Sequence, residues 1–173
     1  MGNLATPEAL LHRWEEMQRD ASLQDLPYKI ELNSWGKVEM SPASVRHGQL
    51  QAAVVEELKL KLRDGVSIVE CPILTDIGIR VPDIAWASAG FMRQHGAASP
   101  LPRAPEICVE VISASNVAAE ITEKTRAYLA AGALEVWLVA ENGSIRYIDA
   151  SGEHAHSGFP IAVTLPDLTK GYP

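Results

Sequence analysis

Residues 106–113 read EICVEVIS, and this stretch decides the fold. Such a nearly continuous apolar run is typical of a central strand that is covered on both faces of its sheet. A helix is expected from about Val117 to Ala131, with Gly132 at its end, and residues 134–140 (LEVWLVA) predict another buried strand. A strand, a helix and a second strand in this order form a βαβ unit with a parallel strand pair, which indicates the α/β class.

The chain before this unit predicts a helix, a hairpin and a second helix. Residues 6–8 (Thr-Pro-Glu) combine a capping hydroxyl, a proline and an acid, which is typical of a helix start, and this helix should end near Asp20. The extended runs YKIEL and KVEM flank residues 33–36, whose glycine suits the turn of a hairpin. The second helix is expected over about residues 45–63, with His47 at the head of its buried face.

The remaining segments complete a mixed pattern. VSIVEC, IGIRV and DIAWA are strand-like, residues 88–105 form a loop with a short helical piece, and SIRYIDA alternates like an edge strand. We therefore predict a mixed central sheet flanked by helices, with an N-terminal helix and hairpin. Because 173 residues are about the size of one domain, we expect a single domain with a helical segment (residues 1–26), a core (residues 27–165) and a tail (residues 166–173).

Composition limits the classes of function. The net charge of −7 argues against a protein that coats nucleic acid with a broad basic surface. An acidic nuclease is still compatible, because part of its charge is a carboxylate cluster that a divalent cation neutralises. No apolar run approaches the ~20 residues of a membrane helix, so we expect a cytoplasmic protein without membrane contact. Cys71 and Cys108 have no CxxC spacing and are interpreted as buried thiols rather than metal ligands.

Two acids stand in apolar surroundings, where a carboxylate is costly to bury. Glu110 lies in the middle of the EICVEVIS run and needs a partner, either an arginine in an ordinary salt bridge or a cation in a functional site. Asp83 follows Pro82 between two apolar segments, and Pro-Asp is also a common turn pair. The residues alone leave both interpretations open for each acid.

Lys124 lies on the inner face of the helix that follows the Glu110 strand. It stands three residues after Ile121 and four before Tyr128, inside the apolar stripe of that helix. Its side chain can extend to solvent, pair with Glu120 one turn earlier, or meet Glu110, because a crossover helix packs back over its sheet. An inward lysine beside a buried acid makes a functional site plausible.

Four stretches stand in order along residues 28–165: VEMSPASVRHG, RVPDIAWAS, APEICVEVISASN and EKTRAYLAAGALEVWLV. None of them is specific alone, since Pro-Asp and Glu-Val-Ile are common. The ordered set resembles the PD-(D/E)xK, or restriction-endonuclease-like, nuclease superfamily, and within it the Uma-type family. The resemblance implies a restriction-endonuclease-like fold and a nuclease activity.

The resemblance also implies roles for individual residues. Asp83 is the acid of the Pro-Asp element, and Glu110 is the acid of the Glu-x-Lys element. This chain has Ile112 where the lysine of that element would fall; in the Uma-type branch the lysine comes from the following helix, and Lys124 is the matching residue. His47 matches a further recurring position, although a histidine at the head of an apolar stripe is also commonly a hydrogen-bonded core residue.

These residues lead to the hypothesis of a metal-dependent endonuclease that hydrolyses phosphodiester bonds of DNA. Asp83, Glu110 and the carbonyl of Val111 would hold Mg²⁺, with Mn²⁺ as a substitute. Lys124 would orient water or stabilise the charge that develops on phosphorus, and His47 would serve as acid, base or phosphate contact. A homodimer is a further expectation, because dimers are common among nucleases that cut both strands.

Other functions stay open at this stage. A catalytically silent nuclease fold that serves as a binding or assembly module would suit the acidic charge and the lack of a DNA-reading motif. A metal-dependent hydrolase of another phosphoester would use the same residues. Glu39 or Glu70 is considered as the ligand of a second ion, and the sequence does not place either of them.

Overall fold

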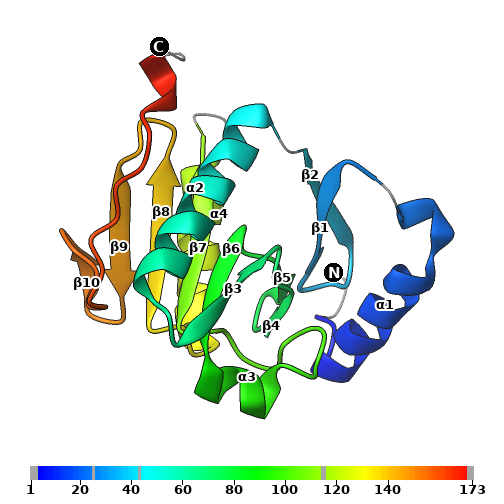
Figure 1. Cartoon of the computed structure of the whole chain (residues 1–173). Helices are drawn as coiled ribbons and strands as arrows, with labels where there is room; N and C mark the ends of the chain where they lie inside the picture. The colour runs from blue at the N-terminus through cyan, green and yellow to red at the C-terminus, as the bar shows by residue number, and fades with distance from the viewer. Residues whose placement is uncertain (1–3, 25, 43, 114–115, 171–173) are drawn as a thin grey trace.

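The computed structural model describes residues 4–24, 26–42, 44–113 and 116–170, which form two sheets and four α-helices (Figure 1). The larger sheet has the order β10-β9-β8-β7-β6-β3 and contains β3 (Gly65–Val69), β6 (Ile84–Ser88), β7 (Ile107–Ile112), β8 (Glu135–Ala140), β9 (Ile145–Asp149) and β10 (Gly152–His154). The smaller sheet has the order β2-β1-β5-β4 and contains β1 (Tyr28–Asn33), β2 (Val38–Pro42), β4 (Ile73–Thr75) and β5 (Gly78–Arg80).

The helices largely follow the sequence prediction. They are α1 (Pro7–Arg19), α2 (Val45–Lys61), α3 (Ala89–His95) and α4 (Ala118–Ala130), with 3₁₀ turns at Ala21–Leu23 and Leu168–Lys170. Thr6 caps α1 as expected, because its hydroxyl accepts a hydrogen bond from the N–H of Ala9. Within the described part of the chain, no helix is long and apolar enough to cross a membrane.

The predicted βαβ unit is present. β7 and β8 pair in parallel and α4 connects them, whereas β6, β3, β9 and β10 join the same sheet by antiparallel pairing. The sheet is therefore mixed, as predicted. The predicted hairpin also forms, but it belongs to the second sheet with β5 and β4. The sequence did not indicate β4 and β10. The edge position expected for SIRYIDA is wrong, because β10 pairs with the outer side of β9.

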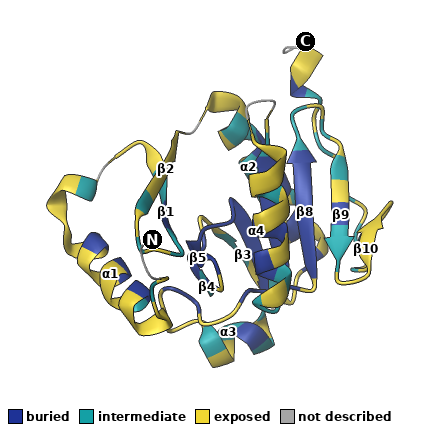
Figure 2. Cartoon of the chain, turned by 180° about the vertical axis from the view of Figure 1, so that it is seen from behind, coloured by how far each residue is buried: buried dark blue, intermediate teal, exposed yellow. Residues whose placement is uncertain are grey.

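α2 and α4 cover opposite faces of the larger sheet (Figures 1 and 2). Successive side chains of β7 point to opposite faces. Ile107 packs in one apolar cluster with Leu58 of α2, and Cys108 packs in another with Tyr128 of α4. The alternation therefore directs Glu110 to the α4 face. β8 lies beside α4 in Figure 2 and is buried except at its last residue, so this sheet is the centre of the core.

α1 and the smaller sheet form a third apolar cluster, in which Trp14 packs with Leu32 and Ile79. Leu32 and Ile30 share one face of β1, so the intervening polar residues occupy the other face. Lys29 and Glu31 thus point away from α1. The hairpin holds them over the end of the larger sheet where β6 begins and β7 ends.

Replacement of Leu58 by alanine tests the packing of α2 on the sheet. Leu58 is 0% exposed, so the cavity left by Leu58→Ala should lower the free energy of unfolding by about 2–5 kcal/mol. Leu60 is 55% exposed on the same helix, and Leu60→Ala should change it by no more than about 0.5 kcal/mol. Urea unfolding followed by circular dichroism measures both values, and equal losses would contradict this packing.

Candidate functional site

Asp83 and Glu110 lie side by side at the ends of two neighbouring strands. In the antiparallel pair of β6 and β7, Ile84 is opposite Val109, so Asp83, one residue earlier, comes next to Glu110. Their exposed fractions are only 1% and 4%. Oδ2 of Asp83 accepts a hydrogen bond of 2.7 Å from the N–H of Val111. This bond fixes the Asp83 carboxylate against β7.

Lys29 supplies a positive charge to both acids. Its Nζ lies 2.7 Å from Oδ1 of Asp83 and 3.3 Å from Oε2 of Glu110. The partner of Glu110 is thus a lysine of the N-terminal hairpin. Lys29 was not among the predicted site residues. The usable signal was the Lys-x-Glu spacing of Lys29 and Glu31, which places two charges on one strand face opposite the apolar Leu32.

His47 makes a further contact with Asp83. Its Nε2 lies 3.2 Å from Oδ1 of Asp83, and its side chain is 27% exposed. Ser44 caps α2 by accepting the N–H of His47, which places the histidine in the first turn of the helix. His47 is therefore a residue at the border with solvent that touches a site acid, rather than a core histidine.

Tyr128 completes the surroundings of Glu110. Its hydroxyl donates a hydrogen bond of 2.7 Å to Oε1 of Glu110. Burial and the nearby charge of Glu110 raise the pKa of Tyr128 well above its ordinary value, so the hydroxyl keeps its proton and remains a donor. The sequence placed Tyr128 on the inner stripe of its helix but assigned it to the apolar core.

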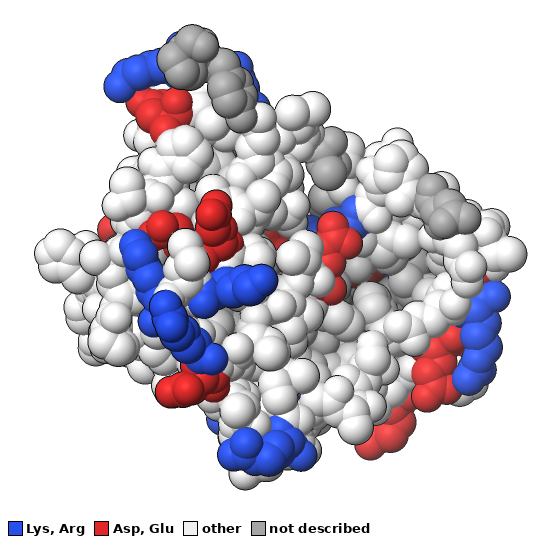
Figure 3. Space-filling model, viewed as in Figure 1, with Lys and Arg blue, Asp and Glu red and all other residues white. Residues whose placement is uncertain are grey.

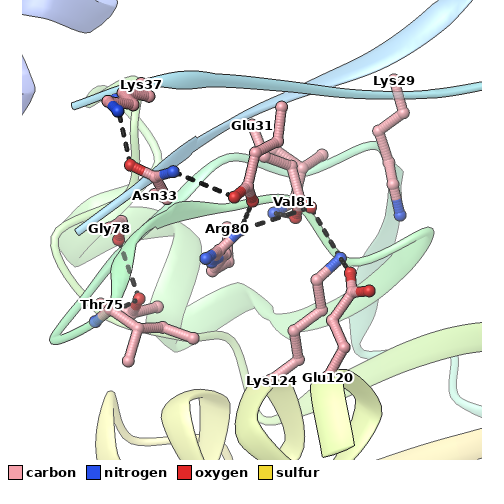
Figure 4. A network of polar contacts seen from close by, with 12 residues as sticks. Lys29, Glu31, Asn33, Lys37, Thr75, Gly78, Arg80, Val81, Glu120 and Lys124 are labelled. Carbon is pink, nitrogen blue, oxygen red and sulfur yellow. Dashed lines mark hydrogen bonds and ion pairs between the residues drawn. The ribbon is translucent and has the colours of Figure 1, made fainter. Parts of the chain in front are cut away.

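Lys124 lies on α4 below the hairpin, and its ammonium pairs mainly with the carboxylate of Glu31 (Figure 4). Nζ of Lys124 is 2.6 Å from Oε2 of Glu31 and 3.7 Å from Oε1 of Glu120. The Glu120 pair was one of the three alternatives for Lys124. The third alternative, an ion pair between Lys124 and Glu110, is wrong. The charge of Lys124 affects the Glu110 carboxylate only at longer range. Glu31 takes its place because β1 directs this acid toward α4 (Figure 4).

These side chains line one pocket of ≈ 400 Å³. Asp83, Glu110, Lys124, His47 and Val111 all contribute to its wall, so the residues named from the sequence share one cavity. Its ionisable lining residues are Lys29, His47, Glu70, Asp83, Glu110, Glu120, Lys124 and Glu141. Figure 3 shows a hollow between α2 and the hairpin with both acidic and basic atoms inside it. The catalytic role of these residues stays a prediction.

Glu31 of β1 contacts α4, β5 and the segment that follows β5, beside this pocket. Its Oε1 accepts a hydrogen bond of 2.7 Å from the N–H of Val81, and its Oε2 lies 3.7 Å from Nη1 of Arg80. Arg80 also binds Glu39. Of the two acids considered for a second ion, Glu39 is thus engaged outside the pocket, whereas Glu70 lines it.

The two central acids differ in ionisation. Burial raises the pKa of Glu110 to about 7; Asp83 adds to the rise, and Lys29 and Lys124 oppose it. Burial also acts to raise the pKa of Asp83, but the hydrogen bond from His47 and the charge of Lys29 outweigh it and hold this pKa well below its usual range. Burial acts to lower the pKa of Lys29, but the two acids outweigh it and raise that pKa. Near neutral pH the site therefore combines an ionised Asp83, a charged Lys29 and a Glu110 that titrates.

The donor set can be compared with the needs of a metal ion. Among the described residues, no group of three or more His, Cys, Asp or Glu side chains is arranged to hold a metal. Asp83 and Glu110 would supply two carboxylates, and the other ligands would be backbone oxygen and water. Mg²⁺ is commonly held in this way. The pair fits such an ion, and the ammonium of Lys29 between the carboxylates demonstrates that a positive charge is accommodated there.

Comparison with known proteins identifies the family. Residues 13–153 match the sequence model of the Uma2 family, described as "Putative restriction endonuclease". The chain belongs to the Uma2 family. A crystal structure described as a putative nuclease belonging to DUF820 from Anabaena variabilis ATCC 29413 is similar in fold, with a TM-score of 0.64 and 16% sequence identity over 82% of this chain and 89% of that chain. A search among curated proteins found no match. The Uma2 match confirms the predicted family, and the structural similarity confirms the predicted fold class.

The raised pKa of Glu110 predicts a dependence of stability on pH. The unfolded chain releases this proton near the ordinary value of 4.5, whereas the folded protein keeps it to about 7. Stability should therefore fall between these pH values, by on the order of 3 kcal/mol for a shift of this size. Glu110→Gln removes the ionisation, so its stability relative to the wild type should rise across that window.

Urea unfolding at several pH values measures this difference. Glu120→Gln is the matched control, because the Glu120 side chain is 53% exposed and should show no comparable trend. Parallel pH profiles for the wild type and Glu110→Gln would contradict the assigned ionisation of Glu110.

Proposed function

We propose that this Uma2 protein is a divalent-metal-dependent endonuclease that hydrolyses phosphodiester bonds of DNA. The observation that carries the proposal is the Asp83–Glu110 pair, which is buried and yet lines a pocket that also contains Lys29 and Lys124. Two buried carboxylates are unfavourable in a purely structural role unless cations compensate them. Membership of the Uma2 family and the nuclease-like fold support the reaction class.

The proposed ligands are Asp83, Glu110 and the carbonyl of Val111, with Mg²⁺ as the ion and Mn²⁺ as a substitute. The N–H and C=O of one strand residue face the same neighbouring strand. Since the N–H of Val111 binds Asp83, its carbonyl is expected on the same side of β7. When bound, the ion would polarise the phosphodiester and lower the pKa of a coordinated water.

The side chains of the pocket would bind substrate and move protons. Lys124, held by Glu31, would present its charge to the phosphate and stabilise the charge that develops on phosphorus. His47 borders solvent, so it is placed to exchange a proton or contact a phosphate. With a net charge of −7, binding of DNA would depend on these few cations of the pocket. A homodimer, with one site for each strand, remains part of the proposal.

A second candidate is a catalytically silent binding module with the same fold. The observation that favours it is Lys29, which already satisfies one oxygen of each acid. A hydrolase of another phosphoester would share the chemistry of the proposed nuclease and differ in substrate. A substrate panel of plasmid, single-stranded DNA, RNA and small phosphodiesters separates these functions.

Substitutions in the pocket test the nuclease proposal. Asp83→Ala and Glu110→Ala should abolish Mg²⁺- or Mn²⁺-dependent DNA cleavage, because each removes a proposed ligand. Lys124→Ala should slow cleavage roughly 100-fold, as expected for the loss of one group that stabilises transition-state charge. Gel assays of plasmid and single-stranded DNA measure the rates.

Asp76→Asn is the control, since Asp76 is an exposed acid paired with Arg126 on the surface. Its cleavage rate should match the wild type. Full activity in all three pocket variants would refute the site. A wild-type protein that binds DNA but cleaves nothing in the panel would favour the binding module.

A further inference from the structure

Lys29 holds the two carboxylate oxygens that remain available at the acid pair. Oδ2 of Asp83 is engaged by the N–H of Val111, and Oε1 of Glu110 is engaged by the hydroxyl of Tyr128. Both donors belong to the core elements β7 and α4. The remaining oxygens, Oδ1 of Asp83 and Oε2 of Glu110, both face Nζ of Lys29 at 2.7 and 3.3 Å. Nε2 of His47 also lies 3.2 Å from Oδ1 of Asp83, so Lys29 is the group that contacts both oxygens. A divalent ion bridging the pair would need these same two oxygens.

Two cations cannot share that position. At the separations of an ion-pair contact, like charges repel strongly in a site screened from water. The Lys29 side chain is only 12% exposed, and its charge is compensated chiefly by the two acids. Binding of a bridging ion would therefore remove the partners of the Lys29 ammonium and expel it from its place.

A second pocket beside Lys29 could receive the displaced ammonium group. Lys29 also lines a second pocket of ≈ 400 Å³, on the α1 side of β1, whose wall includes Trp14 and Tyr28. Glu70 is exposed and lines both pockets. The long flexible side chain of a lysine can turn about its rotatable bonds, so Lys29 can move toward Glu70 without movement of β1.

We propose that Lys29 is the resident cation of the Asp83–Glu110 pair and that it competes directly with the divalent ion for this pair. Lys29 thereby sets the metal affinity of the site: the ion binds only as the ammonium leaves. This inference rests on the proposed function, because it takes the two acids as metal ligands. The N-terminal hairpin, which carries Lys29, would thus take part in metal binding.

Calorimetric titration of Mn²⁺ into the full chain, freed of metal with EDTA, tests the competition. The pH should be 8, above the pKa of Glu110. Lys29→Gln should bind Mn²⁺ roughly tenfold more tightly than the wild type, because the ion no longer has to displace an ammonium from the two acids. Lys124→Gln is the matched control, because it removes the same charge from the same pocket while its Nζ contacts Glu31. Because the charge of Lys124 acts on Glu110 only at longer range, the affinity of this variant should increase clearly less than that of Lys29→Gln.

Equal or weaker binding by Lys29→Gln would overturn the inference. Equal tightening in both lysine variants would also overturn it, because the effect would then reflect pocket charge alone. Absence of Mn²⁺ binding in the wild type and in Lys29→Gln would overturn both this inference and the metal-dependent function.

Lysine labelling followed by mass spectrometry gives an independent measurement on the wild type. Saturating Mg²⁺ should increase the labelling rate of Lys29, while Lys124 stays slow and the exposed Lys59 stays fast. Lys29 that remains protected in Mg²⁺ would overturn the inference even if DNA is cleaved. Release of Lys29 by Mg²⁺ without any cleavage would uphold it and refute the nuclease function instead.

Discussion

Two carboxylates, those of Asp83 and Glu110, are removed from water at the point where β6 begins and β7 ends, and the rest of the site compensates this cost. Desolvation of an acid is unfavourable unless hydrogen bonds and opposite charges replace the lost water. Here the replacements come from separate elements: a backbone N–H of β7, a tyrosine of α4, a histidine of α2 and a lysine of β1. The packing of these elements around the larger sheet is therefore also what makes the acid pair tolerable.

The smaller sheet contributes two charged side chains that pair with ionisable groups of the larger sheet and α4. One face of β1 packs on α1 through apolar residues, and the other presents Lys29 and Glu31 to the larger sheet. The two charges have different partners: Lys29 pairs with Asp83 and Glu110, and Glu31 pairs with Lys124. Five buried or nearly buried ionisable groups, Lys29, Glu31, Asp83, Glu110 and Lys124, are thus paired between the hairpin, the larger sheet and α4. The site is consequently complete only when the hairpin is docked on the larger sheet.

This charge pattern reconciles an acidic protein with the proposed action on a phosphodiester. A net charge of −7 argues against attraction through a broad basic surface, but the pocket concentrates Lys29, Lys124 and His47 around two acids. The hydrogen bond from His47 and the charge of Lys29 hold Asp83 ionised against its burial, whereas burial raises the pKa of Glu110 to about 7. Groups that differ in ionisation near neutral pH are suited to cation binding and proton transfer.

The sequence by itself determined the local elements and the kinds of chemistry. Apolar runs and caps predicted the βαβ unit and the helices, and the cost of burying Glu110 indicated that it needs a partner. Only the tertiary structure decided which charged side chains form ion pairs with one another. Lys29 is 54 and 81 residues away from its two acids, and Glu31 is 93 residues away from Lys124. Such pairings depend on how the hairpin docks on the larger sheet, and no helical or strand period in the chain encodes the contact between surfaces so distant in sequence.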